Sequence, residues 1–238
     1  MENSKWGGIY KIGGAAALGA VLVGLFEIFI TFLPGGNAAQ ETVLDWFRLF
    51  QGNWFMGLRN LGLLNILLNT LAIFTFFALY AAHRRNAYRP YAALAMIVAL
   101  IGVGVFFATN RAFSMLALSR QYQAASTDVQ RMVLEAAGQS MLAVGQSHTP
   151  GTFLGFILLE AAAVMMSLVM LRSGVFSRAT AYAGLLGFGL LLLFECITAF
   201  ISGLSSTAQL LAMLGGLASM VWYILIARRL FQLARIER

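Results

Sequence analysis

The chain has 238 residues, of which 60% are apolar and only 11% are charged, and its mean hydropathy is +0.81. Soluble domains are about 45–50% apolar and about 25% charged, so this composition excludes a water-soluble globule, a disordered tail and a disulfide scaffold. The 24 glycines and only 3 prolines favour closely packed helices over a turn-rich barrel. We therefore predict an all-α integral membrane protein.

Six stretches between charged residues are long enough to cross the hydrocarbon layer, which requires about 20 apolar residues. The last two share one interval and are separated by a predicted hinge at residues 203–207. We predict one transmembrane bundle over residues 1–238, with spans at about 11–33, 61–83, 91–110, 151–172, 179–202 and 208–228.

The basic residues predict how the bundle is oriented. Eleven of the sixteen lysines and arginines lie at the termini or in the short connections after the second and fourth spans. By the positive-inside rule, these segments are cytoplasmic. We expect a multi-pass membrane protein with both termini in the cytoplasm. The net charge of +7 then reflects topology, and no long basic patch interleaved with aromatic residues indicates a nucleic-acid partner.

Two connections on the outer side carry amphipathic patterns. Residues 41–51 place apolar side chains at helical spacing, and Trp46 suits the lipid headgroup layer. Residues 127–146 begin with a capping box formed by Thr127 and Gln130 and continue with an apolar stripe. We predict two outer helical segments, the first lying on the membrane surface. The stripe on the second suits packing against other helices, with a partner-binding surface as the alternative.

Three acidic residues lie inside predicted spans, where an ionisable side chain costs about 2.5–3.5 kcal/mol on insertion scales. They are Glu27, Glu160 and Glu195. At about 1.5 Å per residue, all three lie about 10–14 Å below the outer ends of their helices. Other polar side chains on the same faces or at the same level complete the set of candidate ligand-binding residues: Asn65, Asn69, Thr31 and Thr198.

This asymmetric distribution predicts a polar cavity that opens outward and is closed inward by apolar helices. The carboxyls could act as an acid/base pair, as a proton relay or as counter-ions to a cationic ligand. The alternative is that each protonated Glu is a hydrogen-bonding contact between helices. Polar groups do not continue along the full depth, which disfavours an ion channel.

Chemistry beyond the carboxyls is sparse. His83 and His148 are predicted on opposite sides of the membrane, so they cannot share a metal ion. Cys196 follows Glu195 on the helix but points about 100° away, as expected of a packing residue. No nucleotide-binding or hydrolase motif is present. We predict no metal and no cofactor.

The resemblance of the chain to a known family rests on Glu27, on the glycine-rich stretch 151–156 and on the stretch from Arg172 to Gly187. The chain resembles a family of uncharacterised bacterial six-span membrane proteins, defined by a domain of unknown function. The proline usual in the short turn of such proteins is replaced here by Ser177. The resemblance implies a six-helix protein of a prokaryotic inner membrane. It implies no activity, so no functional residue is carried over.

Three functional hypotheses follow. The first is a protein that binds a lipid or other amphiphile in an outward-facing intramembrane cavity. The second is an integral-membrane enzyme that uses two glutamates as acid and base on a lipidic or isoprenoid substrate. The third is an accessory subunit that packs against other membrane subunits. Membrane lipids are expected partners in each case.

Overall fold

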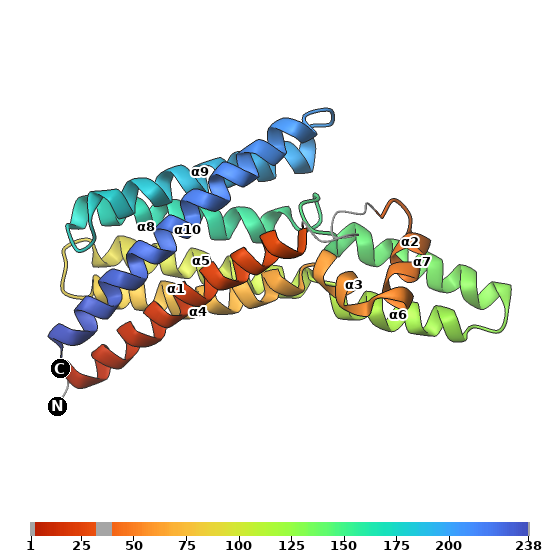
Figure 1. The fold of residues 1–238 in the computed structure, drawn as a ribbon, viewed down its shortest axis with the longest axis horizontal. Coiled ribbons are helices and arrows are strands. Elements are labelled where there is room, and N and C mark those ends of the chain that lie inside the picture. Colours follow the sequence, from red (N-terminus) through yellow and green to blue (C-terminus); the bar gives the residue numbers. More distant parts are fainter. Residues whose placement is uncertain (1–2, 32–39, 238) are drawn as a thin grey trace.

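The computed structural model describes residues 3–31 and 40–237, and over these residues the chain forms ten helices and no strand (Figure 1). The helices are α1 (Asn3–Thr31), α2 (Val43–Gly52), α3 (Trp54–Asn60), α4 (Leu63–Ala82), α5 (Arg89–Thr109), α6 (Ala112–Ala124), α7 (Asp128–Gly145), α8 (Phe153–Ser173), α9 (Arg178–Phe200) and α10 (Ser205–Ile236).

Within the described ranges, six helical segments are long and apolar enough to cross a membrane. They correspond to α1, α4, α5 continued by α6, α8, α9 and α10. The prediction of an all-α protein with six candidate spans is confirmed. Only residues 203–204 of the predicted hinge fall between α9 and α10, because α10 already begins at Ser205. Gly203 adopts a left-handed backbone conformation with φ +86° that glycine tolerates without a steric penalty. Residues 32–33 of the first predicted span lie outside the described residues.

The six long helices close into a ring. Going around it, α1 packs against α4, α4 against α5, α5 against α8, α8 against α9, α9 against α10, and α10 against α1. Glycines allow close approach at several of these contacts: a Cβ on Gly102 would lie 2.9 Å from the backbone nitrogen of Leu159, and a Cβ on Gly187 would lie 2.6 Å from that of Ser219. Small residues are how helices in lipid gain van der Waals contact.

The start of α1 and the end of α10 lie at the same end of the bundle, called here the terminal end (Figure 1). Arg84, after α4, forms an ion pair of 2.7 Å with Glu237, and its guanidinium stacks 4.7 Å from the centre of the Trp6 ring. Arg229 on α10 donates a hydrogen bond of 2.8 Å to the carbonyl of Val175, between α8 and α9. Basic connections that are distant in sequence therefore meet at the terminal end.

Helices α2, α3, α6 and α7 form a separate cluster beyond the opposite end of the bundle (Figure 1), called here the distal cluster. Helices are present at both segments predicted to be amphipathic, whereas α3 and α6 were not predicted. The apolar face of α2 is covered by protein: Trp46, Phe47 and Phe50 are buried in one core with Met115 of α6 and Leu142 of α7.

Helix α7 begins as predicted, since the Thr127 hydroxyl accepts the Gln130 backbone N–H and the Gln130 side chain accepts that of Thr127. Its apolar stripe is divided between two environments. Leu142 is buried in the distal cluster, whereas Met132 is 60% and Val133 is 63% exposed. The first half of α7 therefore presents an apolar face that the described residues do not cover.

Candidate functional site

Glu27 lies in a cluster with Arg59 and Thr31 at the distal end of α1. The Arg59 guanidinium forms an ion pair with the Glu27 carboxylate and donates a hydrogen bond to the Thr31 hydroxyl. That hydroxyl in turn donates to the Glu27 carbonyl at 2.9 Å. The Arg59 side chain is only 7% exposed, whereas that of Glu27 is 42% exposed. This ion pair joins α3 to α1 and gives Glu27 a partner of its own.

Glu160 and Glu195 form a second cluster, on the neighbouring helices α8 and α9. They are 8% and 1% exposed, and they lie close enough for the charge on one to act on the other. Because α1 packs against α4 and α10, whereas α8 packs against α5 and α9, the structure brings together two of the three predicted carboxyls and leaves Glu27 separate.

His148 completes this second cluster, called here the His148 cluster (His148, Glu160 and Glu195). The His148 Nδ1 lies 2.6 Å from Glu195 Oε1. The imidazole stacks on Phe156, with ring centres 4.8 Å apart, and meets the edge of Phe194 at 4.9 Å. Its side chain remains 36% exposed, so it connects a buried carboxyl pair to the surface of the protein.

A tight turn between α7 and α8 places the imidazole. His148 has a φ of +58°, and it is the one non-glycine residue in the described ranges with a positive φ. The hydroxyls of Thr149 and Thr152 both donate to the Gln146 carbonyl, at 2.7 and 2.9 Å. A Cβ on Gly151 would lie 2.2 Å from the Ala143 carbonyl oxygen. Sparsely populated backbone conformations persist only where the surroundings impose them, and they concentrate at functional sites.

Each carboxyl of the His148 cluster has a buried oxygen that lacks a partner. In the described part of the chain, neither Glu160 Oε2 nor Glu195 Oε2 accepts a hydrogen bond. Buried polar groups are nearly always paired, and those that are not require an explanation. Within residues 3–31 and 40–237, no group of three or more His, Cys, Asp or Glu side chains is arranged to hold a metal ion.

The two predicted asparagines interact with each other rather than with a carboxyl. The Asn69 amide donates a hydrogen bond of 2.9 Å to the Asn65 carbonyl, one turn earlier on α4. Asn69 is buried, and its Oδ1 accepts no hydrogen bond from any described residue. The described hydrogen bonds therefore do not join the asparagines to any of the three glutamates.

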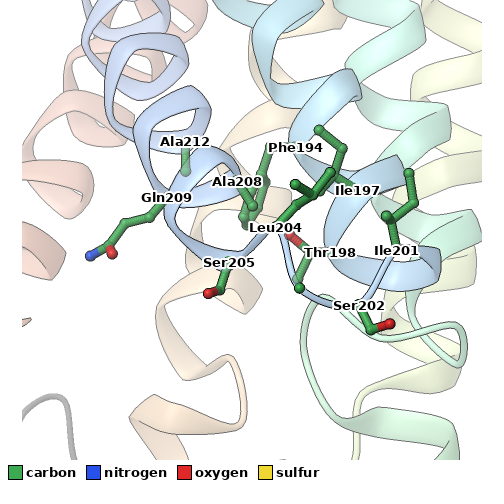
Figure 2. A pocket seen from close by; sticks show the side chains of 11 residues that line it. Phe194, Ile197, Thr198, Ile201, Ser202, Leu204, Ser205, Ala208, Gln209 and Ala212 are labelled. Carbon is green, nitrogen blue, oxygen red and sulfur yellow. The ribbon is translucent and has the colours of Figure 1, made fainter.

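Thr198 lies in a pocket of about 440 Å³ at the turn between α9 and α10, called here the α9–α10 pocket. Figure 2 shows Ile201 and Ser202 at the end of α9, Ser205 and Ala208 at the start of α10, and Gln209 projecting from the other side of α10. Its apolar lining residues are Phe194, Ile197, Ile201, Leu204, Ala208 and Ala212, and its polar ones are Thr198, Ser202, Ser205 and Gln209.

Phe194 joins the α9–α10 pocket to the His148 cluster. It lines the pocket, and its ring also contacts the His148 imidazole. Thr198 follows Glu195 by three residues and so lies near it on the same side of α9. The pocket and the buried Glu195 therefore occupy adjoining positions on α9.

No protein-family model, curated protein or solved structure matches the chain.

Two side chains of the candidate site were not identified from the sequence. Arg59 lies in the last turn of the short helix α3, which was not predicted, and its pairing with Glu27 depends on tertiary structure. His148 was predicted only to lie on the side of the membrane opposite to His83. One signal was available: it precedes the Thr-Pro-Gly sequence at residues 149–151, which is typical of a tight turn.

Proposed function

We propose that this protein binds a lipid or other amphiphile at the distal end of its bundle, in the α9–α10 pocket. The pocket itself is the main support for this proposal. Its volume is within the range of about 300–1,000 Å³ usual for small-molecule sites, and such sites combine apolar walls with a few polar groups that orient the ligand. Apolar side chains from both helices suit an acyl chain, and the hydroxyls near the turn suit a polar head.

The distribution of charge supports an outward-facing site. The arginine-rich connections meet at the terminal end, which the positive-inside rule assigns to the cytoplasm. The α9–α10 turn and the distal cluster lie at the other end (Figure 1). We therefore propose a multi-pass protein of a prokaryotic inner membrane that takes its ligand from the outer leaflet.

The test compares two tryptophan variants on α10. Ala212→Trp fills the α9–α10 pocket, whereas Leu214→Trp alters a side chain that is 49% exposed and does not line the pocket. We expect native mass spectrometry of protein extracted from its own membrane to detect a bound lipid in the wild type and in Leu214→Trp. Ala212→Trp should lose it. A wild type without bound lipid, or equal retention in Ala212→Trp, would refute the proposal.

A second function, acid–base catalysis on a lipidic substrate, is favoured by one observation. Glu195 holds the Nδ1 side of His148, which leaves Nε2 to accept a proton, as in dyads where a carboxylate orients a catalytic histidine. If this function is correct, His148→Asn should abolish conversion of a membrane-lipid extract while the helix content is unchanged. Equal conversion by the variant would exclude it.

A further inference from the structure

The His148 cluster has fewer hydrogen-bond donors than acceptors. Two carboxyls share one buried location, and His148 donates to one oxygen of Glu195. The buried oxygens Glu160 Oε2 and Glu195 Oε2 receive no hydrogen bond from any residue described. When the two carboxyls are ionised, a ligand that satisfies these oxygens must bring donors, because a carboxylate can only accept.

The cluster also lacks positive charge. His148 is the only basic side chain of the cluster, and it can carry at most one positive charge beside the two carboxyls. In the described part of the chain, no lysine or arginine forms an ion pair with Glu160 or Glu195. Arg59 is engaged with Glu27, and Arg111 donates to the carbonyls of Ala108 and Asn110. A buried charge is stable only when it is paired, so the cluster selects a cation.

From these two deficits we propose that the ligand carries a protonated primary amine, which donates hydrogen bonds to Glu160 and Glu195. This inference rests on the proposed function, because the adjoining α9–α10 pocket holds the apolar chain. Phe194, which contacts both the pocket and His148, is the side chain past which the amine reaches the carboxyls. An ammonium group has three donors, whereas a quaternary ammonium group has none.

The test measures binding of three probes with the same alkyl chain to the protein in phosphatidylcholine nanodiscs at pH 7. Dodecylamine carries charge and N–H donors, dodecyltrimethylammonium carries charge alone, and dodecanol carries neither a charge nor an N–H group. Binding to nanodiscs without protein is subtracted. We expect dodecylamine to bind at least about 10-fold more tightly than either other probe, since hydrogen bonds to charged groups are the strong ones.

The decisive variant is Glu160→Gln, which should weaken dodecylamine binding about 10- to 100-fold and leave dodecanol binding nearly unchanged. Glu27→Gln is the matched control, because it neutralises a carboxyl of similar predicted depth outside the cluster, and it should leave both probes unaffected. Glu195→Gln provides a second variant if Glu160→Gln does not fold. Equal affinity for dodecylamine and dodecanol, or equal dodecylamine binding by the folded Glu160→Gln variant, would overturn the inference.

This inference and the proposed function fail in different ways. If the pocket binds amphiphiles without selecting an amine, Ala212→Trp abolishes binding of all three probes while Glu160→Gln changes none. If the pocket binds no amphiphile, Ala212→Trp changes nothing. Adding phosphatidylethanolamine to the nanodiscs identifies the source of the amine. If phosphatidylethanolamine competes with dodecylamine for binding, the natural ligand is a membrane lipid with an amine headgroup. If it does not compete, the natural ligand is a free alkylamine.

Discussion

Three glutamates with nearly the same predicted depth have different partners in the folded protein. Glu27 is matched by a buried arginine, so its charge is neutralised within the chain. Glu195 is matched by His148, whose charge depends on protonation. Glu160 forms no ion pair with a described arginine or histidine, and the charge of Glu195 acts on it. A buried carboxyl needs a partner, a proton or a ligand, and Glu160 is the one of the three glutamates without a basic partner in the described part of the chain.

His83, beyond the end of α4, is a buried histidine with a structural role. Its Nδ1 lies 2.8 Å from the Leu79 carbonyl, and its Nε2 lies 3.0 Å from the Ser173 hydroxyl. The ring stacks on Phe176 with centres 5.6 Å apart. Burial lowers the pKa of His83 below its usual value of 6.5. The neutral imidazole therefore joins the end of α4 to the connection between α8 and α9.

This lowered pKa predicts a pH-dependent stability. The unfolded chain protonates His83 near pH 6.5, whereas the folded protein resists protonation. The stabilisation is therefore complete above that pH and is lost as the pH falls through the lower pKa of the folded state. We expect the free energy of unfolding in detergent to decrease between pH 7.5 and pH 5, with His83 contributing at most about 1.4 kcal/mol per pH unit.

The control is His83→Gln, which removes this titration and keeps a neutral polar side chain. Its free energy of unfolding should be lower at pH 7.5 and should depend less on pH than that of the wild type. Parallel pH profiles for the two proteins would contradict the assignment.

At the scale of the helices, glycines determine which faces come into contact. Gly187 on α9 faces the backbone of α10 so closely that a Cβ would lie 2.6 Å from the Ser219 nitrogen. Gly189, only two residues later, has nothing within 4 Å of its Cβ position. The two glycines share a helix and a local sequence, and they differ in whether another helix approaches. This contact supports the α9–α10 pair that forms the proposed pocket.

We expect Gly187 and Gly189 to respond differently to substitution by alanine. Gly187→Ala should lower the free energy of unfolding by about 1–3 kcal/mol, because overpacking forces the two backbones apart. Gly189→Ala should be neutral or stabilising by up to about 1 kcal/mol, because alanine favours the helix over glycine. Equilibrium unfolding in detergent measures both. Similar losses for the two variants would show that α9 and α10 do not meet at Gly187.

At the scale of the whole molecule, the two ends of the helix bundle differ in structure. One end gathers both ends of the described chain and the arginine-rich connections, and the other carries the distal cluster and the α9–α10 pocket. The exposed apolar face of α7, with Met132 and Val133, belongs to the distal cluster. Any ligand of the pocket and any partner of α7 would therefore act on the same side of the membrane.

Cysteine labelling tests this orientation. The only native cysteine, Cys196, is removed by Cys196→Ala, and single cysteines are introduced at exposed positions of opposite ends. These are Ser126→Cys, between α6 and α7, and Ala87→Cys, between α4 and α5. We expect a membrane-impermeant maleimide to label Ser126→Cys but not Ala87→Cys in intact bacterial spheroplasts, and to label both after lysis. Labelling of Ala87→Cys but not of Ser126→Cys in intact spheroplasts would contradict the proposed topology.

The sequence by itself determined the helical class and the six candidate spans, since both depend on local properties. Lipid requires about 20 apolar residues per helix, and the spacing of charges along the chain records this directly. The α9–α10 turn and the start of α7 were also predictable, because a glycine-containing hinge and a capping box are read from adjacent residues.

Only the tertiary structure decided which polar residues meet. Two side chains at the same depth on different helices are not necessarily neighbours. The order of the helices around the ring determines which side chains come into contact. That order places Glu160 beside Glu195 and separates Glu27 from both. Arg59 and His148 join their carboxyl partners from connecting segments, whose positions depend on contacts between residues far apart in the chain.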